Sequence, residues 1–426
     1  MESGPVVTEP VTVEKTYFVY HPDELWLKGK NRPDFEKQLV NNLKHQLKMV
    51  GVCDFKIVQL HCEILLEAPV QYEAEIRNVS KKVFGISVFA RCYRVDRELS
   101  LLKSKIHDHI RILLEKGPIP SFKVTTSRVD KRYEINSMDL SKDIGALIFE
   151  TFSIPVDLKN PSLTVHIEVQ TGFFLYSTER NDGAIGLPVG SSGRSVVLLS
   201  GGFDSPVAAW SIMRRGCSVD YVHFHSAPYG EWKSSVSKVR MIVKQLATWG
   251  GSRKFYSVPI GDLQRQIALK APEKLRVTLY RRLMVRVALR IANMVKAQSL
   301  TTGDNLGQVA SQTLESMTVI QAAISPFLIC RPLLCDAKQE IIQKAQMIGT
   351  KDISILPGGD CCAHMLPKRV VTKPSIEETD KGESELNINE MVEIAIQNMQ
   401  QININDPWNE ESNDSTNQGC PLEFQE

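Results

Sequence analysis

Val196-Val-Leu-Leu-Ser-Gly-Gly-Phe-Asp-Ser-Pro-Val207 is the most informative stretch of this 426-residue chain. Its four apolar residues predict a buried strand, the glycines that follow predict a tight turn, and Pro206 suits the first position of a helix. Strand and helix patterns then alternate along the chain as far as Ile348. This alternation predicts a doubly wound parallel sheet, and therefore an α/β architecture.

The turn in this stretch has the chemistry of a phosphate site. Gly201 and Gly202 let consecutive amide groups face an anion, and the helix that follows adds its positive N-terminal end. Ser200 and Ser205 can donate hydroxyl hydrogen bonds to phosphate oxygens. Because bare phosphate would repel Asp204, we expect this carboxylate to hold Mg²⁺ beside a triphosphate. The stretch resembles the PP-loop of ATP pyrophosphatases, which transfer AMP to an oxygen; an ordinary glycine turn is the alternative.

Neighbouring strand ends predict the rest of a nucleotide site. In a doubly wound sheet the ligand lies at the carboxyl ends of the strands, which nominates Leu198, Leu199, His223 and Phe224 for the adenine side. A purely structural, buried His223 is the alternative.

Three arginines lie close together on one predicted helix. Arg282 and Arg286 are four residues apart on the same face, and Arg281 is beside them. Arginines on an otherwise apolar helix need a partner, and phosphate is a natural one.

Charge is unevenly distributed along the chain. The net charge is +2, but residues 376–426 contain thirteen acidic residues and one basic residue. Residues 1–375 therefore have 50 basic and 36 acidic residues, a net charge of about +14. Such a body is suited to a polyanion, although solubility alone is a sufficient alternative reason. The acidic segment is also rich in Asn and Gln, which predicts a mostly disordered tail with one helical patch, Ile388–Met399.

Composition excludes several classes of protein. No run approaches the roughly 20 apolar residues of a membrane helix, and Met1–Pro10 lacks the basic and apolar regions of a secretory signal. We therefore expect a globular cytoplasmic protein without membrane contact. The nine cysteines include no pair of Cys-x-x-Cys motifs, so no structural zinc site is expected.

A second stretch, Thr302-Gly-Asp-Asn-Leu-Gly-Gln-Val-Ala-Ser-Gln-Thr-Leu-Glu-Ser316, resembles the signature segment of 4-thiouridine synthetases, also called tRNA sulfurtransferases. Asp23–Arg32 is similar to the opening motif of that family, Phe84-Gly-Ile-Ser and Val156–Pro161 look like its RNA-binding THUMP domain, and Leu187-Pro-Val-Gly190 matches its connector. The resemblance covers roughly residues 17–374. It implies ATP contacts at the following positions: Leu198, Leu199, His223, Phe224, Arg281, Gly303 and Gln312.

The resemblance also implies an arrangement of domains. A ferredoxin-like α+β domain (12–75) and a THUMP domain (76–182) precede a Gly-rich linker (183–194). A PP-loop ATP pyrophosphatase domain (195–375) and the acidic tail (376–426) follow. The THUMP domain would explain the basic body as a surface for the tRNA acceptor end, and two-fold association into a homodimer is implied as well.

The adjacent pair Cys361 and Cys362 is the predicted sulfur site. In the family the corresponding loop holds the cysteine that carries sulfur as a persulfide, and Cys361 is preferred by position. A thiolate is needed for this role, and Lys368 and Arg369 are close enough in sequence to lower a thiol pKa. Two small packing residues are the alternative. A cysteine desulfurase, another persulfide donor or free sulfide would supply the sulfur.

Three departures from the family pattern stand out. The acidic tail occupies the place where some members have a rhodanese domain, and those members are the ones usually linked to sulfur transfer for the thiamine thiazole. Gly303-Asp-Asn replaces the usual Gly-Glu-Ser, and His21-Pro-Asp-Glu24 replaces Tyr-Gly-Glu. A PP-loop ligase or amidotransferase acting on a small molecule, and an RNA-binding protein with a relict nucleotide site, are the competing hypotheses.

Overall fold

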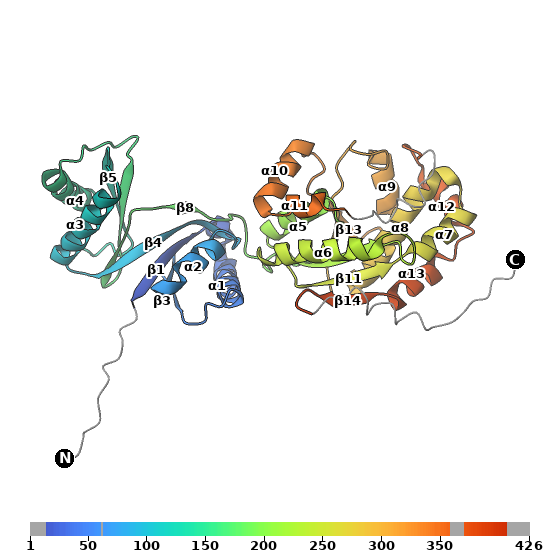
Figure 1. Ribbon diagram of the computed structural model, residues 1–426, viewed down its shortest axis with the longest axis horizontal. Helices are drawn as coiled ribbons and strands as arrows, with labels where there is room; N and C mark the ends of the chain where they lie inside the picture. The colour runs from blue at the N-terminus through green and yellow to red at the C-terminus, as the bar shows by residue number, and fades with distance from the viewer. Residues whose placement is uncertain (1–13, 61–62, 358–369, 407–426) are drawn as a thin grey trace, which may run out of the picture. The chain divides into compact units, whose positions relative to one another are not determined.

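The computed structural model describes residues 14–60, 63–357 and 370–406, which belong to two compact units (Figure 1). We call residues 1–188 the N-terminal unit and residues 189–426 the C-terminal unit. Each is described by itself.

The N-terminal unit is built on an eight-stranded sheet with the order β2-β3-β1-β4-β7-β6-β5, in which β8 also pairs with β4. Its α-helices and strands are β1 (Lys15–Pro22), α1 (Arg32–Met49), β2 (Lys56–Gln59), β3 (Ile64–Pro69), α2 (Glu73–Ser80), β4 (Ile86–Asp96), α3 (Leu99–Lys116), β5 (Phe122–Arg128), α4 (Ser137–Phe152), β6 (Leu163–Val169), β7 (Phe173–Ser177) and β8 (Asn181–Asp182).

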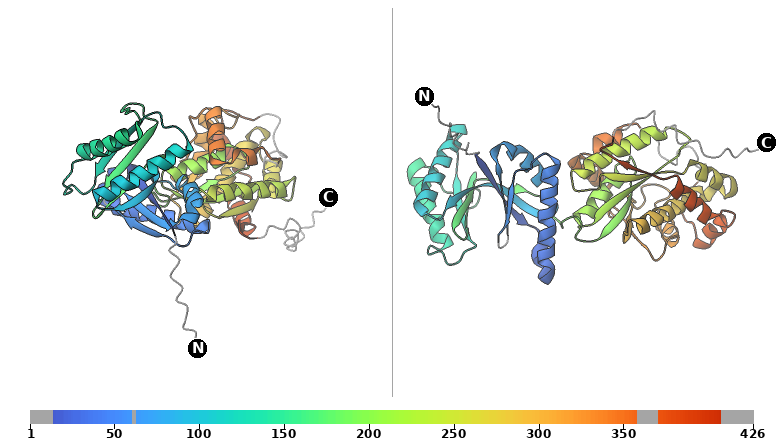
Figure 2. Two further views of the ribbon diagram at one scale, coloured as in Figure 1. Left: turned by 60° about the vertical axis from the view of Figure 1, so that its left-hand side comes forward. Right: turned by 90° about the horizontal axis from the view of Figure 1, so that it is seen from below.

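Strand β4 connects the two halves of this sheet. Its first part pairs antiparallel with β1 and its last four residues pair antiparallel with β7. Helices α1 and α2 pack on the β1 half, whereas α3 and α4 pack on the half that contains β5 and β6 (Figures 1 and 2). Helix α2 crosses the predicted border at 75/76, and Ile76 and Val79 are buried in the first core. The ferredoxin-like core therefore extends further along the chain than the predicted range.

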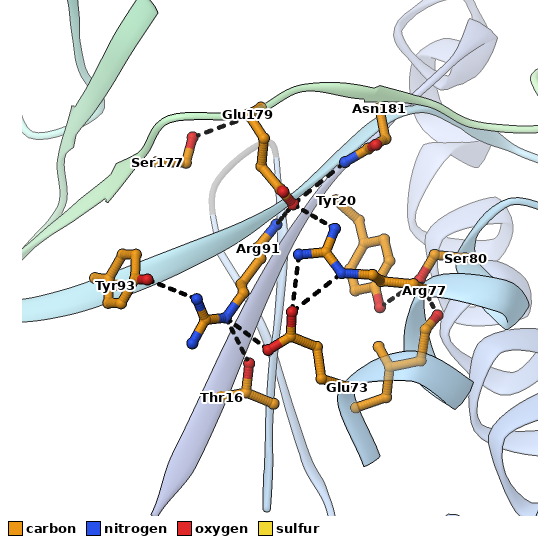
Figure 3. Close-up of polar contacts among 11 residues, drawn as sticks. Thr16, Tyr20, Glu73, Arg77, Ser80, Arg91, Tyr93, Ser177, Glu179 and Asn181 are labelled. Atoms are coloured by element: carbon orange, nitrogen blue, oxygen red, sulfur yellow. Dashed lines mark hydrogen bonds and ion pairs between the residues drawn. The ribbon is translucent and has the colours of Figure 1, made fainter. Parts of the chain in front are cut away.

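A polar network links the segment after β7 to the ferredoxin-like half (Figure 3). Arg77 of α2 donates hydrogen bonds to Glu179 at 2.7 Å and to Glu73 at 2.9 and 3.1 Å. Arg91 of β4 pairs with the other carboxylate oxygen of Glu73 at 2.8 Å, and its backbone N–H donates to Glu179 at 2.9 Å. Each carboxylate thus contacts both arginines, an arrangement that fixes α2, β4 and the outgoing chain together.

The C-terminal unit is a doubly wound sheet with the order β13-β12-β9-β10-β11-β14. The first five strands are parallel and β14 is antiparallel to β11. The elements are β9 (Arg194–Leu198), α5 (Asp204–Arg214), β10 (Ser218–His225), α6 (Trp232–Ala247), β11 (Lys254–Pro259), α7 (Gly261–Lys270), α8 (Arg276–Met294), β12 (Ser299–Thr301), α9 (Leu314–Ala322), β13 (Leu328–Cys330), α10 (Lys338–Ile348), α11 (Lys351–Ile355), α12 (Ile376–Glu383), α13 (Ile388–Gln397) and β14 (Gln400–Asn403). The predicted α/β class and doubly wound parallel sheet are confirmed.

Two groups of helices enclose this sheet. Helices α5, α6, α10 and α11 contact one another, and α8 contacts α7, α9, α12 and α13 (Figure 1). Helix α8 has twelve buried residues because it lies at the centre of the largest apolar core. Strand order reverses between β9 and β12, and such a switch point is where ligands bind in open α/β sheets. No helix among the described residues is both long and apolar enough to cross a membrane.

The prediction of a mostly disordered acidic tail is wrong for residues 376–406, although the helical patch predicted at Ile388–Met399 matches α13. Ser375 caps α12 by accepting a hydrogen bond from Glu378 N, and β14 extends the sheet at β11. Glu383 of α12 accepts hydrogen bonds from Arg282 at 2.9 and 3.0 Å and from Arg286 at 2.7 and 2.9 Å. The acidic composition of this segment therefore serves to neutralise arginines of α8. Residues 407–426 lie outside the described residues.

This pairing also corrects the prediction that Arg282 and Arg286 await a phosphate. Arg282 is 3% exposed and has a second carboxylate partner, Asp380, at 2.6 Å. Because both arginines already have carboxylate partners within the unit, a phosphate is not needed to compensate their charge.

Candidate nucleotide site

The predicted phosphate loop is a sharp turn between β9 and α5. Strand β9 ends at Leu198 and α5 begins at Asp204, so Pro206 is the third residue of the helix and not the first as predicted. Its missing N–H still costs nothing there, since the first four N–H groups of a helix have no partner within it.

Ser205 closes the loop on itself. Its hydroxyl accepts from Ser200 N at 2.8 Å and lies 3.0 Å from the Ser200 hydroxyl and 3.2 Å from the Ser200 carbonyl oxygen. Ser200–Ser205 therefore forms one compact turn at the N-terminus of α5. Gly202 lies in open space on this turn, because a Cβ added there would have no neighbour closer than Ser200 Oγ at 3.6 Å.

Gly303 brings the end of β12 against the start of α5. A Cβ at this position would lie 2.7 Å from Ser205 N and 2.8 Å from the carbonyl carbon of Asp204. Only glycine permits this approach of two backbones. The two loops that the sequence singled out, one after β9 and one after β12, thus meet at the switch point of the sheet.

Asp204 has two partners from other elements. Lys338 Nζ of α10 lies 2.8 Å from one carboxylate oxygen, and Gln308 Nε2 donates to the other at 3.0 Å. The Asp204 side chain is 22% exposed, and Lys338 also lies over the ring of Phe203 at 5.7 Å. Sequence reasoning missed Lys338 and Gln308, because nothing in the local pattern connects a lysine 134 residues away to this carboxylate.

A buried ion cluster supports the loop after β12. Asp304 is 3% exposed and pairs with Arg281 and, at 3.3 Å, with Arg331; it also accepts from Thr302 at 2.8 Å. Burial alone would raise the pKa of Asp304, but Arg281, Thr302 and Arg331 together hold it below its ordinary value. Asp304 is therefore a charged anchor for Arg281, which also donates to the Ser311 carbonyl at 3.1 Å.

The departure at Gly303-Asp-Asn is thus accommodated structurally. Asn305 donates to the carbonyl oxygens of Leu333 and Asp336 at 2.8 and 2.6 Å, and so fixes the chain after β13.

Two buried amide oxygens near the loop have no partner among the described residues, Gln308 Oε1 and Gln312 Oε1. A buried acceptor without a donor is costly, about 1–3 kcal/mol. A ligand with N–H or O–H donors would satisfy them.

His223 is buried and its ring nitrogens have fixed roles. Nδ1 lies 2.9 Å from the Leu199 carbonyl oxygen and Nε2 lies 3.0 Å from Ser235 Oγ. Because a carbonyl only accepts, Nδ1 carries the proton and the Ser235 hydroxyl donates to Nε2. Burial lowers the pKa of His223 to about 4, so the ring is neutral near pH 7. This geometry favours a positioning role for His223 at the loop.

Three further predicted contacts, Leu198, Leu199 and Phe224, lie at or next to the ends of β9 and β10. Phe224 is buried in the main core and Leu198 packs against that core, whereas Leu199 is 2% exposed. Because these side chains pack in the interior, a ligand would contact the backbone at the ends of the two strands.

A cavity of about 620 Å³ lies beside the loop. It is lined by Trp232, Lys233, Lys238, Leu356 and Pro357, among others. Lys238 also packs under Gly201, where an added Cβ would lie 3.0 Å from its side chain, and it donates to the Leu356 carbonyl at 2.7 Å. Cys361 and Cys362, the predicted sulfur site, lie outside the described residues.

The C-terminal unit has a compact Ser-Gly-Gly turn at the switch point, and the helix after this turn begins with an aspartate. These features define it as a nucleotide-binding domain of the PP-loop class. Residues 190–388 match the family "Thiamine biosynthesis protein (ThiI)", residues 18–90 match the "ThiI ferredoxin-like domain", and residues 101–178 match the "THUMP domain".

Relatives of known name cover nearly the whole chain. A probable tRNA sulfurtransferase of Finegoldia magna is 38% identical over 386 residues, which is 89% of this chain and 97% of the relative. Another, of Brevibacillus brevis, is 38% identical over 88% of this chain and 92% of its own length. A solved 4-thiouridine synthetase, crystallised with RNA and ATP, is 33% identical with a TM-score of 0.83, covering 91% of this chain and 99% of that one. The chain belongs to the tRNA sulfurtransferase family.

Proposed function

We propose that this chain is an ATP-dependent tRNA sulfurtransferase that makes 4-thiouridine at position 8 of tRNA. The observation that carries the proposal is the meeting of the Ser200–Ser205 turn with Gly303 at the switch point. It is supported by the likeness over 91% of the chain to a 4-thiouridine synthetase whose structure holds RNA and ATP.

The residues present fit ATP. The triphosphate would lie against the amides of Ser200, Gly201 and Gly202, where the N-terminal end of α5 favours an anion. Gln312 Oε1, a buried acceptor, suits a donor such as the adenine amino group. Asp204 would hold Mg²⁺ on the phosphates, and Lys338, now its ion-pair partner at 2.8 Å, would contact the same phosphates.

The chemistry has two parts. Uridine O4 attacks the α-phosphorus of ATP and pyrophosphate leaves, so that C4 carries AMP as a leaving group. The terminal sulfur of a persulfide on Cys361 then attacks C4, and AMP departs. Cys362 attacks the Cys361 sulfur, which leaves a Cys361–Cys362 disulfide and the thiolated base, and an external thiol reductant restores the cysteines. With free sulfide, the sulfide attacks C4 directly.

The partners follow from this chemistry. The tRNA would bind the N-terminal unit through its THUMP domain, and a cysteine desulfurase or another persulfide donor would load Cys361. We expect the reaction to take place in the cytoplasm, in a homodimer. A role in sulfur transfer for thiamine synthesis stays a prediction.

Two variants separate the two parts of the reaction. Asp204→Ala should abolish the release of pyrophosphate that depends on tRNA, because the metal ligand is lost. Cys361→Ser should keep that release and lose thiolation from a persulfide donor. Pyrophosphate release that is independent of tRNA would instead favour a ligase for a small molecule, and unchanged thiolation by Cys361→Ser would contradict the carrier role.

A further inference from the structure

A histidine and two glutamates converge in the N-terminal unit, whereas the candidate nucleotide site belongs to the C-terminal unit. His21 is on β1, Glu63 immediately precedes β3, and Glu168 is on β6. His21 Nδ1 lies 3.7 Å from Glu63 Oε1, and His21 Nε2 lies 3.6 Å from Glu168 Oε1. One nitrogen and two carboxylate oxygens of this group all lie within 4.8 Å of one another. Strands β4 and β7 lie between β1 and β6 in the order of the sheet, so the cluster joins side chains from strands that do not pair with each other.

The contacts within the cluster do not satisfy its members. The Glu63 and Glu168 side chains are only 10% and 14% exposed, and the distances to His21 are too long for hydrogen bonds. Glu168 Oε2 is buried and has no hydrogen-bond partner among the described residues. Burial and the neighbouring Glu63 raise the pKa of Glu168 to about 9. Two adjacent carboxylates with so little access to water are therefore unfavourable as anions unless a proton or a metal ion lies between them.

The surroundings resemble the outer shell of a metal site. Gln170 Nε2 donates to Glu63 Oε2 at 2.9 Å and so orients this carboxylate. A cavity of about 200 Å³ adjoins the cluster, lined by His21, Glu168 and Arg180, among others. Arg180 favours the charged form of Glu168 electrostatically, but no ion pair joins it to either glutamate in the part of the chain that the structure describes. A cation between the carboxylates would compensate their charge more fully.

We propose that His21, Glu63 and Glu168 bind one divalent first-row transition-metal ion. One imidazole and two carboxylates are a donor set that such ions accept, and three protein ligands leave coordination positions open toward the cavity. Bonds of about 2.1 Å need donors roughly 3–4 Å apart. The three donor atoms lie within 4.8 Å of one another, so side-chain movements of about 1 Å would complete the site. The ion would join β1, β3 and β6, and thereby the two halves of the sheet.

The test is a titration of the chelator-treated full chain with Mn²⁺. The amplitude of the electron paramagnetic resonance signal of free Mn²⁺, measured after each addition, gives the amount bound. The Asp204→Ala background removes the metal position proposed at the nucleotide site, and Mn²⁺ prefers oxygen and imidazole ligands over thiolates. We expect one saturable equivalent of Mn²⁺. Glu168→Gln, in the same background, should weaken binding by at least about tenfold.

Glu67→Gln is the matched control. Glu67 lies on β3 outside the cluster and pairs with the exposed Lys15, so Mn²⁺ affinity should be unchanged. If the circular dichroism spectrum of Glu168→Gln is not native, His21→Gln replaces it in the test, because this variant also removes one proposed metal ligand. An Asp204→Ala chain without saturable Mn²⁺ binding, or equal affinity in folded Glu168→Gln, would overturn the proposal and leave a carboxylate pair that shares a proton.

Discussion

Single residues set the charge of the nucleotide site. His223 and His225 on β10 are both buried, and their pKa values are lowered by burial to about 4 and about 3. Neither ring is therefore a proton donor near neutral pH. Asp204 and Lys338 are the charged pair at the start of α5, and Asp304 anchors Arg281 beside them. Catalytic proposals for this loop consequently rest on these four charged side chains and on the backbone.

The buried histidines predict how stability depends on pH. An unfolded histidine titrates near pH 6.5, whereas folded His223 titrates at about 4, so below pH 6.5 the unfolded chain binds a proton that the folded chain does not. The free energy of unfolding should fall between pH 6.5 and 4 by on the order of 3 kcal/mol from His223 alone. Urea denaturation of the wild type and of His223→Gln across this range measures it. An equal decline in both proteins would contradict the buried, neutral assignment.

Gly303 offers a test of the contact between the two loops. Gly303→Ala places a Cβ 2.7 Å from Ser205 N, so the turn must shift. We expect at least a tenfold loss of pyrophosphate release that depends on tRNA, with a destabilisation of about 1–3 kcal/mol. Gly145→Ala is the control, because this glycine of α4 has nothing within 4 Å of an added Cβ and alanine favours helix. Full activity in Gly303→Ala would show that this close approach is not needed.

At the scale of elements, α12 is attached to α8 by charge as well as by packing. Arg282 is buried, and Glu383 accepts hydrogen bonds from both Arg282 and Arg286. Breaking one side of a buried ion pair is costly because the other charge stays uncompensated.

Glu383→Gln should therefore lower the free energy of unfolding by about 3 kcal/mol. The exposed pair of Arg290 and Glu393, at 2.8 Å between α8 and α13, gives the control, since Glu393→Gln should cost less than about 1 kcal/mol. Chemical denaturation of both variants at the same pH measures the difference. Equal effects would mean that burial of the Glu383 pair contributes nothing.

These elements also show what the sequence could and could not predict. The β9–turn–α5 segment was predictable, since an apolar run, two glycines and a helix start are all local signals. The cap of α4 is a local signal too, since Asn136 accepts from Asp139 N at 2.9 Å three residues on. In contrast, the roles of Glu383 and Lys338 depend on partners about 100 residues away or more, and the acidic composition of α12 resembles that of a disordered segment. The nucleotide-site residues stay a prediction, although the structure brings the two loops together.

At the scale of the whole molecule, a body with a net charge of about +14 over residues 1–375 precedes an acidic C-terminal segment. Glu383 neutralises Arg282 and Arg286 internally, and the basic residues without such partners are the ones available to a polyanion. A tRNA-binding enzyme needs such an excess.

The charge predicts a strong dependence of tRNA binding on salt. Because each phosphate contact releases a counterion, the Kd for unmodified tRNA should rise at least about tenfold between 50 and 200 mM KCl. Fluorescence anisotropy with labelled tRNA measures this, with a neutral polymer of the same length as the control for non-specific association. A Kd independent of salt would contradict binding through the basic body.

Mass spectrometry of nucleosides is the experiment to perform before the others. Unmodified tRNA is incubated with the full chain, Mg-ATP and sulfide, then digested and analysed for thiolated bases. We predict that the digest of the wild-type reaction contains 4-thiouridine and that the digest of the Asp204→Ala reaction does not. No thiolated base together with no cleavage of ATP in response to tRNA would contradict the proposed reaction and favour a PP-loop ligase for a small molecule.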